Sequence, residues 1–245
     1  MSVTSRYKEA WEGFWREAPE EQGAVFWDSE PALTAGLHLA LAEPYLTAAG
    51  LPLIDLGCGN GTQTRFLADR FPRVVGIDLS QAAVEHAEHA DAAAPETIGR
   101  AEYRRLDAID KAGIEALRDE LGDAHVYMRG VLHQCEPADR RPLADSIATL
   151  LGARGRGFVV ELAEQAGPIL MGLAKSPTGP PPKLLPVFQH GIAPAEVSDA
   201  AVPDLFSAAG LDILESGEMP LITTDYTADG KRIELPSKWL IVGRS

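Results

Sequence analysis

The run LIDLGCGNG at Leu53–Gly61 constrains the fold of this 245-residue chain more than any other feature. Its first residues are mostly apolar, as in a parallel strand that is buried on both faces. Three glycines then alternate in 57–61, here called the glycine loop, and glycine permits tight turns and close approach of a ligand. The segment from Thr62 has helical spacing, and VVGID after it indicates a second strand that ends at Asp78. The order predicts a βαβ unit with a carboxylate near the end of each strand.

The spacing of these glycines separates two kinds of nucleotide site. A dinucleotide fingerprint needs G-x-G-x-x-G, in which the third glycine opens the helix beneath the pyrophosphate. Here the glycines follow G-x-G-x-G, and position 62 is threonine. Asp55, directly before the glycines, would repel a pyrophosphate but would suit a cationic ligand such as a sulfonium amino acid. A nicotinamide-dependent or nucleotide-sugar oxidoreductase is therefore disfavoured but stays open as an alternative.

Three motifs carry a resemblance to a known family. They are DLGCGNG at Asp55–Gly61, GIDLS at Gly76–Ser80 and RLDAID at Arg105–Asp110. They resemble the cofactor-binding motifs of class I S-adenosylmethionine-dependent methyltransferases, in the same order and at expected strand ends. The resemblance extends from about Leu51 to Glu161. It implies a Rossmann-like fold and S-adenosyl-L-methionine as the cofactor.

The resemblance also implies contacts to the cofactor, residue by residue. Asp55 and the glycine loop would hold the methionine end. Asp78 would accept hydrogen bonds from both ribose hydroxyls, because a carboxylate that accepts two vicinal hydroxyls forms charge-assisted bonds of fixed geometry. Leu79 would pack against the adenine, and Asp107, with Ala108 beside it, would meet the adenine amino group. The expected cofactor-binding residues are Asp55, Gly57, Cys58, Gly59, Gly61, Asp78, Leu79, Asp107, Ala108, Arg129 and Gly130.

A candidate catalytic residue follows the fourth expected strand, in the segment YMRGVLHQC. Ligands of open α/β sheets bind beyond the carboxyl ends of the strands, so catalytic groups are expected here. The run RGVLHQ resembles the corresponding segment of small-molecule O-methyltransferases, in which a histidine acts as base, and His133 holds that position. Those enzymes usually continue with an acidic and an aromatic residue, whereas this chain has Gln134 and Cys135. An orienting or packing role for His133 therefore stays open.

The net charge and the cysteines limit the class of protein. A formal charge of −14 disfavours nucleic-acid substrates, because phosphate binding needs clusters of lysine and arginine. No apolar run is long enough to span a bilayer, and the N-terminus lacks the apolar core of a secretory signal. The cysteines form no metal-binding pattern, and His86 and His89 lack further ligands, so no metal site is expected. These features predict a soluble, cytoplasmic protein that binds a small-molecule substrate, without nucleic-acid or membrane partners.

Strands alternate with helices along most of the chain after residue 46. This pattern predicts an α/β fold with a mostly parallel sheet, helices on both faces and an antiparallel last strand. The later expected strands are Glu102–Leu106, Ala124–Met128, Gly157–Leu162, Leu211–Met219 and Lys238–Val242. The expected helices between them are Gln81–Ala90, Ile109–Leu121, Asp139–Leu151 and Pro203–Ala209. A loop around Asp229 is expected before the last strand.

Two segments fall outside this alternation. Residues 1–45 are expected to form an N-terminal helical cap, helical over 5–45, and residues 46–245 the methyltransferase domain. Residues 163–202 within it are rich in proline and glycine yet strongly apolar, which disfavours a disordered linker. We therefore expect 163–202 to form a lid that contributes to a substrate pocket. His190 in this lid is a candidate for a substrate contact, as is Glu161 at the end of strand five.

The sequence as a whole favours methyl transfer from S-adenosylmethionine to a small, apolar or aromatic metabolite. Methyl transfer is an in-line displacement, so positioning and desolvation supply much of the rate. A hydroxyl acceptor benefits from a base such as His133, and O-methylation is therefore favoured. An amine that binds neutral or an activated carbon needs less help, so N- and C-methylation stay open. A catalytically silent S-adenosylmethionine-binding protein and a methyltransferase that acts on a protein are further alternatives.

Overall fold

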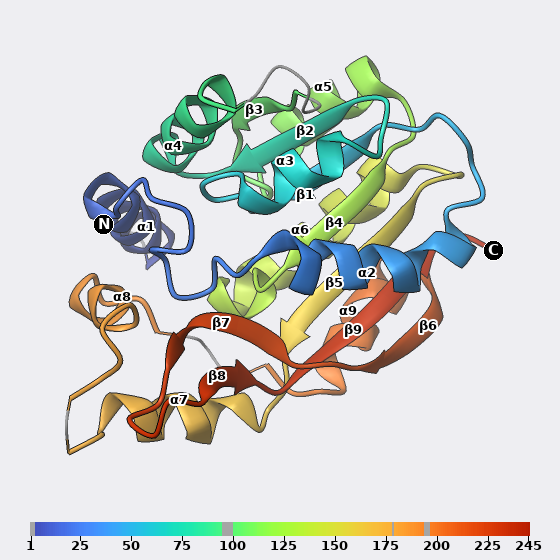
Figure 1. Cartoon of the computed structure of the whole chain (residues 1–245). Coiled ribbons are helices and arrows are strands. Elements are labelled where there is room, and N and C mark those ends of the chain that lie inside the picture. The colour runs from blue at the N-terminus through green and yellow to red at the C-terminus, as the bar shows by residue number, and fades with distance from the viewer. Residues whose placement is uncertain (1–2, 95–99, 178, 194–196) are drawn as a thin grey trace.

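A seven-stranded sheet forms the centre of the computed structural model, which describes residues 3–94, 100–177, 179–193 and 197–245 (Figure 1). Its strands are β1 Leu53–Leu56, β2 Val74–Asp78, β3 Glu102–Arg105, β4 His125–Arg129, β5 Arg156–Leu162, β6 Asp212–Glu218 and β9 Ser237–Gly243. Their order is β3-β2-β1-β4-β5-β9-β6. β1 to β5 run parallel, and β9 runs antiparallel to both of its neighbours. The expected sheet with its antiparallel last strand is confirmed.

Helices cover both faces of this sheet (Figure 1). They are α2 Ala35–Ala42, α3 Thr62–Ala68, α4 Gln81–Ala92, α5 Lys111–Leu121, α6 Pro137–Leu151 and α9 Ala201–Ala208. Because side chains alternate along a strand, Ile54 and Leu56 of β1 pack with α5, α6 and α9, whereas Leu53 packs with α2 and α3. The expected helices and strands named above agree with the observed bounds to within two residues. No helix in the described ranges is long and apolar enough to cross a membrane.

The N-terminal segment is less helical than the sequence predicts. Helix α1 covers Val3–Glu17, and the short 3-10 helices η1 Pro31–Leu33 and η2 Glu43–Tyr45 flank α2. The chain between α1 and η1 forms turns instead. Gly23 adopts a φ of +76°, which favours glycine, and its amide donates a 2.9 Å hydrogen bond to Asp28 Oδ2. The expectation of helix throughout 5–45 is therefore wrong for this turn.

A two-stranded hairpin occupies part of the chain where the sequence predicts only a loop. Its strands, β7 Leu221–Tyr226 and β8 Arg232–Leu235, pair antiparallel. Polar residues fill buried positions of β7, which removes the usual alternation of apolar and polar residues. Thr223 is fully buried, and its hydroxyl donates a 2.7 Å hydrogen bond to the Ile233 carbonyl. The Thr224 amide donates to the Phe26 carbonyl at 2.8 Å, so the hairpin is tied to the N-terminal segment.

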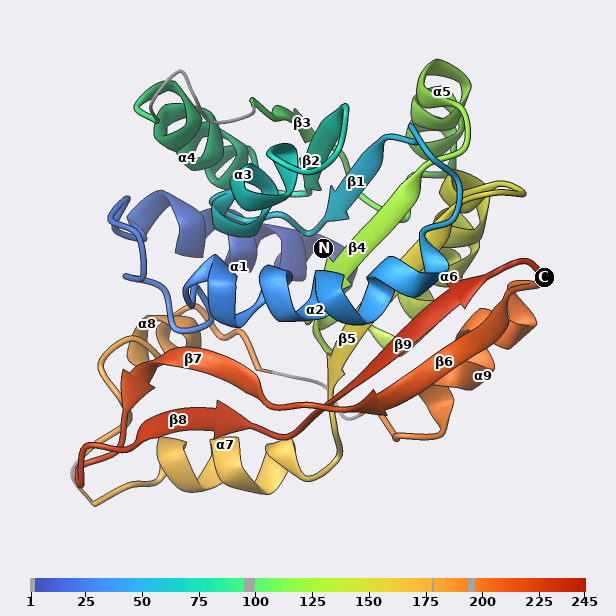
Figure 2. The same ribbon diagram turned by 45° about the vertical axis from the view of Figure 1, so that its right-hand side comes forward.

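Segments that are far apart in the sequence share a further hydrophobic core. They are α1 with the loop after it, the start of α4, the hairpin, and the helices α7 Ala166–Ala174 and α8 Leu185–Gln189. Residues 178 and 194–196 of the expected lid lie outside the described residues. The buried members of this cap core are Phe14, Trp15, Val25, Phe26, Ala82, Ala83, Ala166, Leu170, Leu184, Val187, Ile192, Leu221, Ile233 and Leu235. Figure 2 shows α1, α7, α8 and the hairpin grouped beyond the carboxyl ends of the parallel strands.

Candidate active site

The glycine loop turns at the end of β1 and is held against β2. The amides of Gly57 and Cys58 both donate to the Ile77 carbonyl, at 2.8 and 3.1 Å. Gly57 has a φ of +75°, and a Cβ built on it would lie 2.7 Å from Val131 Cγ2. Glycine is therefore required there both for the backbone conformation and for space. The loop backbone reaches a cavity that extends towards the cap core.

Asp78, the last residue of β2, joins the glycine loop to the start of α4. Its Oδ2 accepts a 3.0 Å hydrogen bond from the Gly59 amide, and its Oδ1 accepts a 2.9 Å bond from the Ser80 amide. Burial raises the pKa of this carboxyl to about 6, although these backbone hydrogen bonds oppose the rise. Each oxygen retains further acceptor capacity. The carboxylate has the chemistry to accept two vicinal hydroxyls, which is the contact expected for a ribose.

Asp107 and Ala108 follow β3 and line the same cavity as Leu79. Asp107 Oδ1 accepts a 3.1 Å hydrogen bond from the Ile109 amide, which fixes the turn before α5. Its Oδ2 forms an ion pair with Lys8 of α1. The carboxylate that is expected to meet the adenine amino group therefore also holds α1 across the cavity. Sequence reasoning missed Lys8, because a lysine on an exposed helix face carries no signal of its own.

Asp55 and Arg129 bring opposite charges to the cavity. Asp55 is 4% exposed, and its Oδ2 accepts a 2.6 Å hydrogen bond from the Thr64 hydroxyl. Burial raises the pKa of Asp55 to about 6, while Thr64 and the positive charge of Arg129 lower it. Arg129 Nη2 donates to the Trp27 carbonyl at 2.9 Å, whereas Nη1 is buried without a hydrogen-bond partner among the described residues. Buried donors are seldom left without partners, so this atom fits a ligand carboxylate.

His133 lies on the 3-10 helix η3 Leu132–Gln134, directly after β4. Its Nδ1 is 2.8 Å from Glu161 Oε2, and both side chains are buried. Glu161 also accepts 2.8 Å hydrogen bonds from the amides of Val131 and Leu132. A carboxylate can only accept, so the Nδ1 proton points at Glu161 and Nε2 is left as the basic nitrogen. Glu161 thus positions His133 rather than lining the cavity itself.

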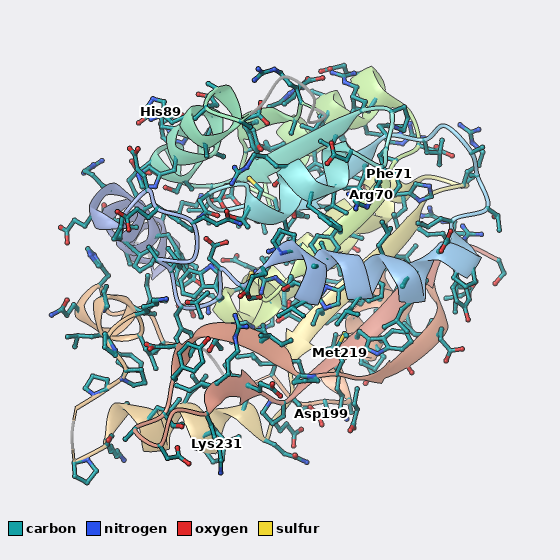
Figure 3. All side chains as sticks on the ribbon, in the orientation of Figure 1. Arg70, Phe71, His89, Asp199, Met219 and Lys231 are labelled. Atoms are coloured by element: carbon teal, nitrogen blue, oxygen red, sulfur yellow. The ribbon has the colours of Figure 1, made fainter. Side chains whose placement is uncertain are left out.

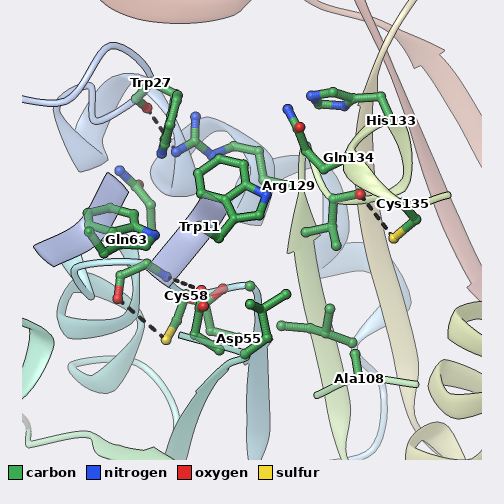
Figure 4. Close-up of a pocket in the computed structure, with 18 of the residues that line it drawn as sticks. Trp11, Trp27, Asp55, Cys58, Gln63, Ala108, Arg129, His133, Gln134 and Cys135 are labelled. Carbon is green, nitrogen blue, oxygen red and sulfur yellow. Dashed lines mark hydrogen bonds between the residues drawn. The ribbon is translucent and has the colours of Figure 1, made fainter. Parts of the chain in front are cut away.

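Much of the rest of the cavity wall is apolar and aromatic, and Figure 4 shows Trp11 and Trp27 in it. Its apolar and aromatic members include Tyr7, Trp11, Trp27, Leu162, Leu170, Leu184, Val187, Phe188, Leu221 and Leu235. Most of them belong to the cap core or pack against it. Trp27 lies in the loop after α1 and Leu162 ends β5, whereas the others come from α1, the segment 163–202 and the hairpin. The cavity contains about 1540 Å³ of empty space, including the part that is open to solvent.

The expected cofactor-binding residues line this cavity except Gly61, and so does His133. A Cβ on Gly61 would lie 2.8 Å from Tyr103 and 2.9 Å from Ala87, so this glycine serves close packing at the start of α3. His190 is not among the lining residues, and its Nε2 lies 3.1 Å from a carboxylate oxygen of Glu17. His89 is exposed and points outward from α4 (Figure 3).

Comparisons with known proteins agree with this geometry. A family model described as a methyltransferase domain matches residues 53–155. An S-adenosylmethionine-dependent methyltransferase from Anabaena variabilis ATCC 29413 has a similar structure, with 30% sequence identity and a TM-score of 0.86. The match covers 100% of this chain and 96% of that protein's chain. Magnesium protoporphyrin IX methyltransferase from Synechocystis PCC 6803, determined with bound S-adenosylmethionine, covers 100% of this chain and 98% of its own, with 16% identity and a TM-score of 0.63.

A shorter match links the chain to a curated protein. Trans-aconitate 2-methyltransferase from Paracidovorax citrulli (strain AAC00-1) is 44% identical over 66 residues, which span 26% of this chain and 25% of that protein. Together these findings show that the chain belongs to the S-adenosylmethionine-dependent methyltransferases. Members of this family use S-adenosylmethionine, which is therefore the cofactor of this chain. The oxidoreductase alternative is thereby removed.

The residues present fit this cofactor. Asp55 offers an anionic partner for the ammonium group of the cofactor's methionine end. Arg129 Nη1, which has no hydrogen-bond partner in the described part of the chain, offers a donor for the carboxylate of that end. Asp78 offers acceptors for the ribose, and the apolar side chain of Leu79 lies next to it in the sequence and lines the same cavity.

Proposed function

We propose that this protein methylates a hydroxyl oxygen of a small, apolar or aromatic molecule, with His133 as the general base. The observation that carries the proposal is the His133–Glu161 pair in the wall of the cavity. A base needs a free nitrogen, and the hydrogen bond from Nδ1 to Glu161 leaves Nε2 in that state. The two backbone amides that donate hydrogen bonds to Glu161 hold η3, and with it His133, in place.

The bound cofactor supplies a methyl group on a positively charged sulfur, which is a good leaving group. His133 Nε2 would take the hydroxyl proton of the acceptor while the acceptor oxygen forms its bond to the methyl carbon. The imidazolium so formed would lie 2.8 Å from the Glu161 carboxylate, which stabilises its charge. The aromatic and aliphatic wall would exclude water from the reacting oxygen. The residues named therefore position the acceptor and hold one proton.

The apolar wall supports an acceptor that is largely uncharged. Among the described residues that line the cavity, Arg129 is the sole lysine or arginine, and the methionine end of the cofactor accounts for it. A polyanionic acceptor would need further cations there. Aromatic side chains such as Trp11 and Trp27, whose ring centroids lie 5.5 Å apart, suit a flat and apolar molecule.

We also propose that residues 1–45 act as a cap and 163–202 as a lid over the acceptor, with 46–245 as the catalytic domain. Support comes from the cap core, which joins both segments to the β7–β8 hairpin. Tyr7 and Trp11 of the cap and Leu170 of the lid line the same cavity as His133.

The acceptor atom is tested with a panel of hydroxylated aromatic molecules and their matched amines, using S-adenosylhomocysteine release as the readout. The proposal expects turnover of phenols that is lost when the hydroxyl is replaced by hydrogen. Methylation of the amines with no turnover of any hydroxyl compound would overturn the oxygen preference in favour of N-methylation.

A further inference from the structure

Gln134 lies next to the proposed base and has a fixed orientation. The Tyr7 hydroxyl donates a 3.0 Å hydrogen bond to Gln134 Oε1. The rings of Tyr7 and Trp11 meet edge to face with centroids 6.2 Å apart. Burial raises the pKa of Tyr7, and a hydrogen bond with Trp11 lowers it. A phenol has a single proton to donate, and the carbonyl oxygen of an amide can only accept, so the contact fixes Oε1 as the end of the amide that faces Tyr7.

This hydrogen bond decides which end of the amide is free. Because Gln134 Oε1 faces Tyr7, the NH₂ group at the other end of the amide is the end that is left for a ligand. No hydrogen bond of this NH₂ group to another described residue is present, and Gln134 lines the cavity together with His133. In the view of Figure 4 the Gln134 amide lies next to the His133 ring. Two consecutive residues thus present an acceptor, His133 Nε2, and a donor, the Gln134 NH₂ group, to the same cavity.

We propose that Gln134 selects acceptors that carry a second oxygen on the carbon adjacent to the one that bears the methylated hydroxyl. The inference rests on the proposed function, because His133 must bind the hydroxyl itself. The NH₂ group would donate to the neighbouring carbonyl, ether or hydroxyl oxygen while His133 accepts from the reacting hydroxyl. The lid and hairpin side of the cavity is formed by leucine, valine and phenylalanine, so the remainder of the acceptor is apolar. The substrate class is an apolar ring with two adjacent oxygens at one end.

The test compares 2-methoxyphenol with 4-methoxyphenol, two isomers that differ in whether the second oxygen neighbours the hydroxyl. The wild-type protein is expected to favour the 2-isomer by about tenfold in kcat/KM, the effect of one satisfied donor. Gln134→Met keeps the length of the side chain but removes both donors, and it should bring the ratio close to one. Tyr7→Phe frees the amide to rotate and should give an intermediate ratio. The ratio within one variant does not depend on how much of the protein is folded.

Titration with S-adenosylhomocysteine shows whether each variant retains its cofactor site, and unchanged affinity is expected. Equal kcat/KM for the two isomers in the wild type would overturn the inference but leave O-methylation intact. A preference that persists in Gln134→Met would also overturn it. Absence of methylation of both isomers would contradict the proposed O-methylation of phenols and the inference with it, so the two failures are distinguishable.

Discussion

Two parts of the cavity are built in different ways: the part that we assign to the cofactor, around Asp55, Asp78, Asp107 and Arg129, and the part that we assign to the acceptor, around His133 and the cap core. We call them the cofactor half and the acceptor half. In the cofactor half, strand ends and backbone hydrogen bonds within 53–110 position most of the functional groups, as the amides of Gly59 and Ser80 do for Asp78. Arg129, which donates to the Trp27 carbonyl, is an exception. In the acceptor half, the wall comes from α1, the lid and the hairpin. Lys183 joins the last two to the N-terminal turn, because its Nζ donates to the carbonyls of Gly23 and Thr224 at 2.7 and 2.9 Å.

This contrast has a functional consequence. A site built from a local motif can be altered by one residue without disturbing the cap core, and a site built by tertiary packing responds to changes far away in the sequence. Variants in the cofactor half should therefore change cofactor affinity, whereas variants in the acceptor half should change acceptor recognition and stability. The predictions below test this separation.

The largest expected effect is in the cofactor half, at Asp78. Asp78→Asn keeps one oxygen and the shape but loses the charge that strengthens hydrogen bonds to two hydroxyls. The affinity for S-adenosylhomocysteine should fall by roughly 100-fold or more, as measured by isothermal titration. Asp145→Asn, on the exposed face of α6, is the matched control and should bind normally. Unchanged affinity in Asp78→Asn would remove this residue from the ribose site.

Arg129→Met should weaken S-adenosylhomocysteine binding by about 10- to 100-fold, because the carboxylate of the ligand loses a charged hydrogen-bond donor. 5′-Methylthioadenosine has no carboxylate, and its affinity should change little. Titration of both ligands against the wild type and the surface control Arg141→Met isolates this effect. If both ligands weaken equally in Arg129→Met, Arg129 acts through the fold and not through the carboxylate.

Acidification should weaken cofactor binding in the same half. Burial raises the pKa of Asp55 and of Asp78 to about 6, so both are ionised above that pH and take up protons below it. The affinity for S-adenosylhomocysteine should be constant above pH 7 and fall by about tenfold per pH unit below 6 for each carboxylate involved. Titrations between pH 5 and 8 measure this slope, and 5′-methylthioadenosine, which lacks the ammonium group, should show the shallower one. Constant affinity down to pH 5 would contradict the assignment of these two residues.

The smallest expected effect is in the acceptor half. Lys183→Met removes two hydrogen bonds that join the lid, the hairpin and the N-terminal turn, and should lower the free energy of unfolding by about 2 kcal/mol. The KM for an accepted phenol should rise while the S-adenosylhomocysteine affinity stays constant. Thermal unfolding and titration test this, with the exposed Lys175→Met in the same lid as control. A loss of cofactor affinity in Lys183→Met would show that the two halves are not separable.

The same contrast explains how much the sequence could predict. The motifs around Asp55, Asp78 and Asp107 lie at the ends of short strands whose order follows from the βαβ alternation, so the sheet and the meeting of these residues at one cavity could be predicted. The β7–β8 hairpin could not, because Thr223 and Thr224 are buried polar residues that mimic a loop pattern. The role of Tyr7 could have been suspected, since it lies one helical turn before Trp11 on α1, but its bond to Gln134 spans 127 residues.

The most direct test of the central claim is a single variant, His133→Ala, studied by two measurements. The account predicts a turnover of an accepted phenol that is lower by roughly 100-fold or more, the range of a general base. It also predicts an S-adenosylhomocysteine affinity within about twofold of the wild type, because no expected cofactor contact is removed. Near-normal turnover in His133→Ala would contradict its role as the base.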